Sequence, residues 1–113
     1  MGSTEYISTV GVSDVPEGEV VRAVVAGKEI AIYNLNGQFY ATEGLCTHGH
    51  TVLAEGYVEG DLIECRMHGG KFDIRTGKAL VAPCTVDLKS YPVKIEGENI
   101  LVAVPQDSVE PRS

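Results

Sequence analysis

The chain has 113 residues, a length typical of one globular domain, and its 43% apolar and 22% charged residues exclude a disordered or coiled-coil protein. Its net charge of −7 at pH 7 argues against nucleic-acid binding, because contacts with phosphates need clustered Lys and Arg. The negative charge favours instead a partner that presents a basic face.

Neither end of the chain carries a targeting signal that we can identify. Residues 1–5 lack the basic start and the apolar stretch of a secretory signal. No apolar run reaches the roughly 18–20 residues that cross a bilayer. Three cysteines are an odd number, which argues against a disulfide framework. We therefore expect a soluble cytoplasmic protein with reduced thiols and no association with membranes.

Apolar and polar residues alternate along much of the chain, whereas no segment keeps the 3.6-residue period of a long helix. We expect a helical turn near 13–17 and a strand over 20–26, which ends at Gly27. Two strands then flank Asn36-Gly37, a dipeptide typical of a two-residue hairpin turn. They cover residues 29–33 and 38–41.

Three more hairpins are predicted farther along the chain. Their strands cover residues 57–58 and 62–64, 72–74 and 79–81, and 91–95 and 100–104, with Gly60-Asp61, Thr76-Gly77 and 96–99 at the turns. Short strands at such intervals predict an all-β fold, either an antiparallel β-sandwich or an incomplete barrel. We expect one domain over residues 1–104 and a flexible C-terminal tail over 105–113, because this segment is polar and contains two Pro.

Two short boxes combine a thiol with an imidazole: Cys46-Thr47-His48 and Cys65-Arg66-Met67-His68. Sixteen residues lie between His48 and Cys65, and a Gly follows each box. Thiolates and imidazoles that occur together in loops indicate a borderline-soft transition metal. The two boxes are therefore the candidate metal ligands of this chain.

A single zinc ion is one interpretation of these boxes. Structural zinc sites, however, usually space the two ligands of one loop by two to four residues and group Cys with Cys and His with His. Here the order is Cys-His-Cys-His, and a single residue separates Cys46 from His48. With two metal ions, one bound by both cysteines and the other by both histidines, each box would supply one ligand to each ion, and the two boxes would be equivalent.

The spacing Cys-x-His, sixteen residues, Cys-x-x-His resembles the Rieske [2Fe–2S] signature, in which two His replace two Cys on one iron. The resemblance covers about residues 5–104. It implies that Cys46 and Cys65 bind the inner iron and that His48 and His68 bind the outer, solvent-facing iron of one cluster. It also implies a small cluster-binding subdomain whose loops are about 45–51 and 65–72. Residues outside the ligands that match the pattern are Phe39, Tyr40, Ala41, Thr42, Thr47, Gly49, Gly69, Lys71, Phe72, Asp73, Thr76, Gly77, Ala82 and Pro83.

Arg66 departs from the family pattern, since many relatives have Pro there, but this departure removes no ligand. The subtype is indicated by two features that are missing here. Respiratory Rieske proteins join their two loops by a disulfide, and the matching positions here are Thr51 and Met67. Those proteins also direct Ser and Tyr hydroxyls at the cluster, where this chain has Gly70 and Phe72.

The chain therefore resembles the soluble ferredoxin component of a bacterial aromatic-ring-hydroxylating dioxygenase system. That resemblance implies a low-potential carrier of single electrons from an NAD(P)H-dependent flavin reductase to a terminal oxygenase. By this interpretation the chain is an electron-transfer component and has no enzymatic activity of its own.

Three alternatives stay open at this point. The chain could be a Rieske carrier of another system, such as the small subunit of a nitrite reductase or a monooxygenase ferredoxin. It could be a zinc-stabilised binding module, which would contain zinc in place of iron and acid-labile sulfide. It could also be a metal-dependent enzyme, which would turn over a substrate without any partner.

Other polar and thiol residues have simpler interpretations. We interpret His50 as a surface residue of the first loop and Cys84 as a small buried hydrophobe. The carboxylates of Glu55, Glu59, Asp61 and Glu64 could form a docking patch or merely a solvated face. The sequence favours neither of these two interpretations.

Overall fold

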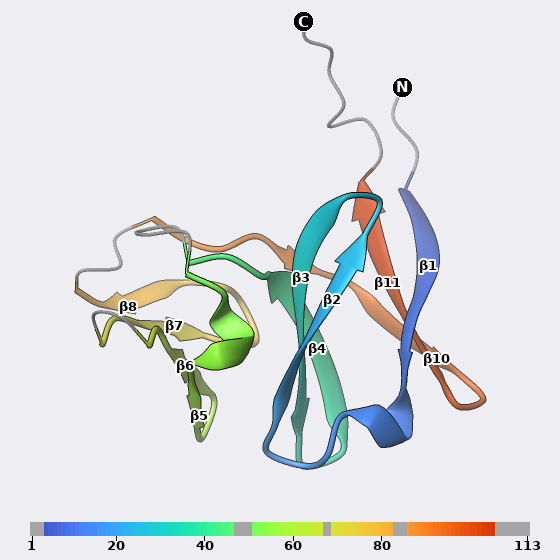
Figure 1. The fold of residues 1–113 in the computed structure, drawn as a ribbon, viewed down its shortest axis with the longest axis horizontal. Helices are drawn as coiled ribbons and strands as arrows, with labels where there is room; N and C mark the ends of the chain where they lie inside the picture. The colour runs from blue at the N-terminus through green and yellow to red at the C-terminus, as the bar shows by residue number, and fades with distance from the viewer. Residues whose placement is uncertain (1–3, 47–50, 67–68, 83–85, 106–113) are drawn as a thin grey trace, which may run out of the picture.

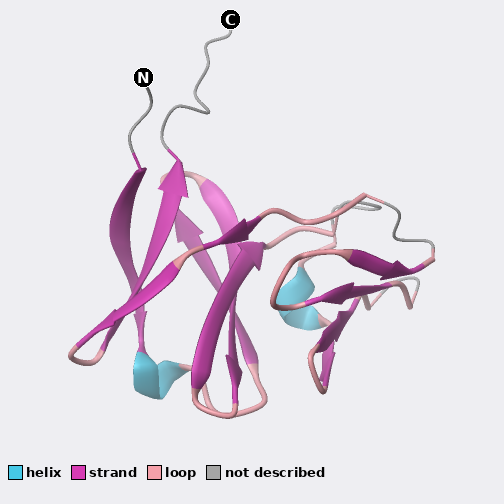
Figure 2. Ribbon diagram, turned by 180° about the vertical axis from the view of Figure 1, so that it is seen from behind, coloured by secondary structure: helices cyan, strands magenta, loops and turns pink. Residues whose placement is uncertain are grey.

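The computed structural model describes residues 4–46, 51–66, 69–82 and 86–105. These residues form eleven strands and two short 3₁₀ helices, so the predicted all-β fold is confirmed. The strands are arranged in three antiparallel sheets, two of which stand together while the third extends to one side (Figures 1 and 2). No helix among these residues is long and apolar enough to cross a membrane.

The first two sheets form a sandwich. The first sheet has the order β1 (Thr4–Gly11), β11 (Asn99–Pro105) and β10 (Val93–Glu96). The second has the order β2 (Val20–Val25), β3 (Lys28–Leu35), β4 (Gln38–Glu43) and β9 (Ser90–Tyr91). The 3₁₀ helix η1 (Val12–Asp14) follows β1 and occupies part of the segment where a helical turn is predicted.

The third sheet is the small one in Figure 1. Its order is β5 (Tyr57–Glu59), β6 (Leu62–Glu64), β7 (Lys71–Asp73) and β8 (Ala79–Val81). The 3₁₀ helix η2 (Leu53–Glu55) precedes it. The second predicted loop, about 65–72, connects β6 to β7, and the first, about 45–51, leads from β4 to η2 just before β5, so the small sheet belongs to the expected subdomain.

Strand β3 separates two apolar cores. Ile30 and Ile32 face the core of the sandwich, where they join buried residues of β11 such as Val102. Ala31 and Tyr33, which alternate with them, belong to a second core shared with the small sheet. All four of these β3 side chains are 0% exposed. A strand that is buried on both faces has a nearly continuous apolar sequence, as this one does.

The Asn36-Gly37 turn is confirmed in detail. Both residues have positive φ, 56° and 88°, as a type I′ turn requires. Its register brings Leu35 opposite Gln38, and the Asn34 side chain accepts a hydrogen bond from the Gly37 N–H at 2.8 Å. The β2–β3 turn has the same signs of φ at Ala26 and Gly27, 52° and 81°.

Two features of the sandwich differ from the sequence prediction. The segment predicted as one strand over 91–95 is divided, because Pro92 has no N–H to donate. Ser90–Tyr91 pairs with β4, and the chain then crosses to the first sheet as Val93–Glu96. Strand β1 was not among the predicted elements, although Tyr6, Ile7 and Val10 are good strand formers.

A prediction follows from the buried phenol of Tyr33. Its hydroxyl lies 2.9 Å from the Thr42 hydroxyl, and burial raises the pKa of Tyr33 well above its usual value. The unfolded chain therefore loses this proton near pH 10, whereas the folded chain keeps it. Above pH 10 we expect the free energy of unfolding to fall by about 1.4 kcal/mol per pH unit from this group.

Urea unfolding at pH 9 to 11.5 checks this expectation. Tyr33→Phe removes the ionisable group, so its free energy of unfolding should fall less steeply over that range than that of the wild type. Tyr6→Phe is the control, because it removes a tyrosine hydroxyl at a position that is 44% exposed. Equal slopes for wild type and Tyr33→Phe would contradict the prediction.

Candidate metal centre

Cys46 lies at the beginning of the first loop, three residues after Glu43, the last residue of β4. Leu45 and Val52 form an isolated antiparallel bridge across the base of this loop. The Cys46 N–H donates a hydrogen bond to the Thr51 carbonyl at 2.8 Å, and the Cys46 side chain is 0% exposed. The backbone thus fixes the thiol in the interior of the molecule.

Cys65 has the corresponding place in the second loop. Glu64 of β6 and Lys71 of β7 pair across the base of the loop. The Cys65 N–H donates to the Gly70 carbonyl at 2.7 Å, and the thiol residue is 1% exposed. The Gly69 N–H in turn donates to the Cys65 carbonyl at 3.0 Å, with Gly69 at a φ of 73° that favours glycine.

The two loops are therefore closed in the same way. In each, the Cys N–H donates to the carbonyl five residues later, and an antiparallel pair flanks that bond. Cys46 and Cys65 also belong to the same apolar cluster of buried residues. The structure therefore brings together the two predicted thiol ligands, which the sequence separates by eighteen residues.

The other predicted ligands, His48 and His68, lie outside the described residues, as do His50 and Cys84. Within the described part of the chain, no three potential His, Cys, Asp or Glu ligands gather at one place. The ligand set of four therefore stays a prediction. The described half fits an iron–sulfur group, because two buried thiols in equivalent loops are the donors that such a group needs.

The side chains beside the cysteines are apolar. Phe72 of β7 is 0% exposed and lies in the same cluster as both cysteines, and Gly70 is buried. Neither residue has a side-chain donor. Gly70 and Phe72, the positions at which the resemblance places hydroxyls in respiratory Rieske proteins, therefore offer no hydroxyl here.

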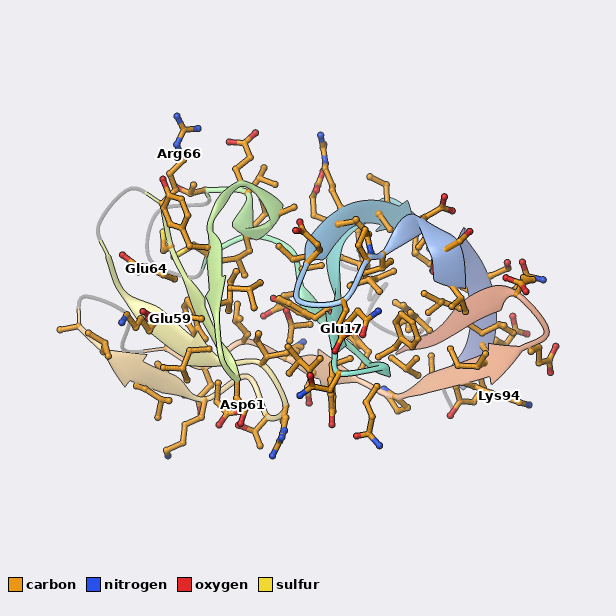
Figure 3. The ribbon with its side chains drawn as sticks, turned by 90° about the horizontal axis from the view of Figure 1, so that it is seen from below. Glu17, Glu59, Asp61, Glu64, Arg66 and Lys94 are labelled. Atoms are coloured by element: carbon orange, nitrogen blue, oxygen red, sulfur yellow. The ribbon has the colours of Figure 1, made fainter. Side chains whose placement is uncertain are left out.

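The carboxylates around the loops are mostly paired with basic side chains. Glu55 of η2 lies 3.3 Å from Arg66, Glu59 of β5 lies 2.8 Å from Lys71, and Asp61 lies 3.4 Å from Arg75. Lys71 lowers the pKa of Glu59 by hydrogen bonding and by its charge. Glu59, Asp61, Glu64 and Arg66 are all at the end of the molecule opposite Lys94 (Figure 3).

These pairs change the interpretation of the four carboxylates. Three of the four have a basic partner, so the group is a mixed-charge surface and not a concentrated negative patch. Surface pairs of this kind contribute only about 0–1 kcal/mol each to stability. The Arg66–Glu55 pair nevertheless connects the second loop to the segment that follows the first. The sequence did not predict this contact.

At two glycines near the loops, Gly56 and Gly77, the backbone passes so close to another segment that no side chain would fit. A Cβ at Gly56 would lie 2.1 Å from the Glu64 carbonyl oxygen, so η2 packs directly on β6. A Cβ at Gly77 would lie 2.2 Å from the Leu88 carbonyl oxygen, and the Leu88 N–H donates to the Gly77 carbonyl at 2.7 Å. No local sequence signal identifies either approach, because each partner is distant along the chain.

A cavity of about 400 Å³ lies between the end of β4 and the segment before β9, with Cys46 among its lining residues. Lys28 and Lys89 also line it. Two hydrogen bonds join Glu43 and Lys89 at this cavity. The Glu43 N–H donates to the Lys89 carbonyl at 2.9 Å, and the Lys89 N–H donates to the Glu43 carboxylate at 2.9 Å.

Comparison with known proteins gives a consistent result. The sequence profile of the Rieske [2Fe-2S] domain matches residues 5–92. The ferredoxin component of the naphthalene 1,2-dioxygenase system of Pseudomonas putida is 48% identical over 100 residues, which are 88% of this chain and 96% of that protein.

Two solved structures share both fold and sequence. The ferredoxin of Sphingomonas yanoikuyae B1 has a TM-score of 0.85 and 39% identity, over 89% of this chain and 100% of that one. A chain from the complex of reduced oxygenase and oxidized ferredoxin in carbazole 1,9a-dioxygenase has a TM-score of 0.80 and 40% identity, over 87% and 92% of the two chains.

The close approach at Gly77 generates a prediction. Gly77 has a φ of 83°, so Gly77→Ala combines an unfavourable backbone conformation with a collision against Leu88. We expect a loss of about 3 kcal/mol or more from the free energy of unfolding. Gly37→Ala is the matched control, since Gly37 has a φ of 88° but nothing within 4 Å of its added Cβ.

The control should lose only about 1–2 kcal/mol, the cost of the left-handed conformation. Urea unfolding of the metal-loaded protein measures both variants. Equal losses for Gly77→Ala and Gly37→Ala would show that the backbone approach to Leu88 contributes nothing.

Proposed function

Because the chain belongs to the Rieske [2Fe-2S] domain family and its cofactor is one [2Fe–2S] cluster, we propose that it is the ferredoxin component of an aromatic-ring-hydroxylating dioxygenase system. It carries single electrons from a flavin-dependent reductase, which oxidises NAD(P)H, to a terminal oxygenase. The observation that supports this most directly is the pair of equivalent loops, each of which begins with a buried cysteine.

We propose Cys46 and Cys65 as ligands of the inner iron, and His48 and His68 as ligands of the outer iron. When bound there, the cluster would supply one-electron redox chemistry. The chain supplies a dry, apolar surrounding for the two thiolates and holds them by the backbone bonds to Thr51 and Gly70. The imidazoles would face the partners, so that the electron has a short path between proteins.

In this proposal the chain transfers electrons and leaves the aromatic substrate to the oxygenase. The relatives are named as ferredoxin components or subunits, which supports a carrier role without an activity of its own. We also propose one domain over 1–104 with a C-terminal tail, in the bacterial cytoplasm. The sequence prediction begins the tail at Pro105, whereas Pro105 is the last residue of β11 and pairs with Thr4. The family match over 5–92 and the pairing of β1 with β11 support a single domain.

We further propose a reduction potential near the low end of the Rieske range, about −150 mV. Phe72 and Gly70 offer no side-chain hydrogen bond that would stabilise the extra negative charge of the reduced state. The basic groups nearest the second loop, Arg66 and Lys71, are compensated by Glu55 and Glu59. The net charge of −7 opposes reduction as well.

Phe72→Tyr tests this explanation of the potential. A tyrosine hydroxyl that donates to the cluster region should raise the potential, by about 60 mV for each 1.4 kcal/mol by which the reduced state is favoured. Spectroelectrochemical titration measures the change. Phe39→Tyr is the control, because Phe39 packs against the other apolar core and its hydroxyl should leave the potential unchanged.

Two results would contradict the explanation. One is a wild-type potential far above 0 mV. The other is equal potentials for Phe72→Tyr and wild type, although a crystal structure shows the new hydroxyl within hydrogen-bonding distance of a cluster sulfur.

The ligand assignment is tested by three cysteine substitutions. Cys46→Ser and Cys65→Ser should each abolish the cluster and weaken the fold around it, because metal binding and folding are coupled. Cys84→Ser should keep the cluster. Iron and acid-labile sulfide analysis should give two of each for wild type and Cys84→Ser, together with a Rieske-type EPR signal on reduction. A colourless, zinc-containing wild-type protein would contradict the proposal.

The function itself is tested by reconstitution with the reductase and the oxygenase of the Pseudomonas putida naphthalene 1,2-dioxygenase system. In their presence, the wild-type chain should support oxygen uptake that depends on both NADH and naphthalene. Without the oxygenase, the chain and the reductase should consume neither oxygen nor naphthalene. Reduction by the reductase with no onward transfer to the oxygenase would contradict the assignment to a dioxygenase system.

A further inference from the structure

The outer strand of the small sheet exposes apolar side chains near the metal centre. Strand β8 is the last in the order β5-β6-β7-β8, so one of its edges has no neighbouring strand among the described residues (Figure 1). Leu80 is 47% exposed and Val81 is 41% exposed. The pairing of β7 with β8 shifts register between Phe72–Ala79 and Lys71–Val81, so Leu80 is an extra residue at a bulge on β8. Leu80 and Val81 are therefore both exposed at this bulged outer strand.

Val86 extends this exposed surface. It is 61% exposed, and the next residue, Asp87, accepts a hydrogen bond from the Ala79 N–H at 2.8 Å. This bond places the segment that contains Val86 against the start of β8 and satisfies one of the strand's N–H groups. Leu80, Val81 and Val86 together are called the apolar strip below.

The apolar strip is close to the second cysteine loop. Val81 pairs in register with Lys71 of β7. Lys71 directly follows Gly70, whose carbonyl accepts the hydrogen bond of the Cys65 N–H. The basic group of Lys71 is itself paired with Glu59 at 2.8 Å. A protein that approaches the second loop along β8 therefore meets apolar side chains and a lysine, Lys71, whose positive charge is balanced by Glu59.

An open edge with apolar side chains is a liability for a protein in isolation, because such an edge can pair with other chains. Exposed apolar groups that gather at one place typically mark a binding surface. The net charge of −7 can accelerate an encounter with a basic partner, but long-range attraction does not define a docked orientation. Short-range apolar contact does so and prolongs the life of the complex.

We propose that the apolar strip is a contact surface for the terminal oxygenase. This inference rests on the proposed function, because it assumes the oxygenase as electron acceptor. A related ferredoxin, 40% identical to this chain, forms a complex with its oxygenase that is ordered enough to be solved. Val81 of the strip pairs with Lys71 at the base of the Cys65 loop, so an oxygenase that approaches this loop to accept the electron meets the strip first at Val81.

Val81→Thr combined with Val86→Thr tests this proposal, since Thr keeps the shape of Val and replaces a methyl group by a hydroxyl. Leu80→Gln is a second, independent variant. Val24→Thr is the matched control, because Val24 is 59% exposed on β2, the outer strand of the sandwich sheet. Absorption spectra and reduction potentials of all variants should equal those of the wild type.

The reconstituted Pseudomonas putida naphthalene system supplies the readout. The KM for this ferredoxin in naphthalene-dependent oxygen uptake should rise about fivefold or more in Val81→Thr/Val86→Thr and in Leu80→Gln, since buried apolar contacts carry much of the binding energy of an interface. It should stay unchanged in Val24→Thr. The ratio of variant to wild-type KM should persist in 0.5 M salt, because salt screens charges and not apolar contacts.

Several results would overturn the proposal. They are equal KM values for the strip variants and Val24→Thr, an effect confined to reduction by the reductase, or a KM ratio that disappears in high salt. A wild-type dimer that the strip variants dissociate would assign the strip to self-association instead. Turnover by the wild-type chain tests the proposed function separately, so a failure of the carrier role is distinguishable from a failure of the strip.

Discussion

The burial of β3 on both faces is the constraint on which the metal end of the molecule depends. Ile30 and Ile32 close the sandwich core, and Ala31 and Tyr33 begin the second core, which contains Cys46 and Cys65. The small sheet thus has no independent interior, since its buried side chains pack against a strand of the sandwich.

Positioning within this frame is achieved mainly by the backbone. Each cysteine loop is closed by a hydrogen bond from the Cys N–H, and the close approaches at Gly56 and Gly77 leave no space for a side chain. The surface ion pairs contribute little to stability, but they determine which charges an arriving protein meets. Backbone hydrogen bonds at both thiols and compensated charge around them suit a carrier that must keep its geometry while it exchanges partners.

The surface of the metal end differs from that of the molecule as a whole. The chain has a net charge of −7, yet the carboxylates of Glu55, Glu59 and Asp61 around the loops have basic partners. The excess negative charge is therefore carried by other residues, from where it acts over long distances and is screened by salt. Close to the centre, uncharged contacts gain importance. This division lets charge govern the rate of encounter and apolar contact govern the docked complex.

The sequence by itself determined the parts of the structure that depend on neighbouring residues. Asn36-Gly37 requires a tight turn whatever surrounds it, and Cys-x-His with Cys-x-x-His defines a ligand pattern that does not depend on the fold. The tertiary structure alone decided the rest. The division of the predicted strand at Pro92, the pair of Arg66 with Glu55, the approach of Gly77 to Leu88 and the exposure of Leu80 and Val81 all depend on segments far apart in the chain. Local patterns of apolar and polar residues contain no information about which distant backbone covers a strand, so these contacts could only be read from the folded molecule.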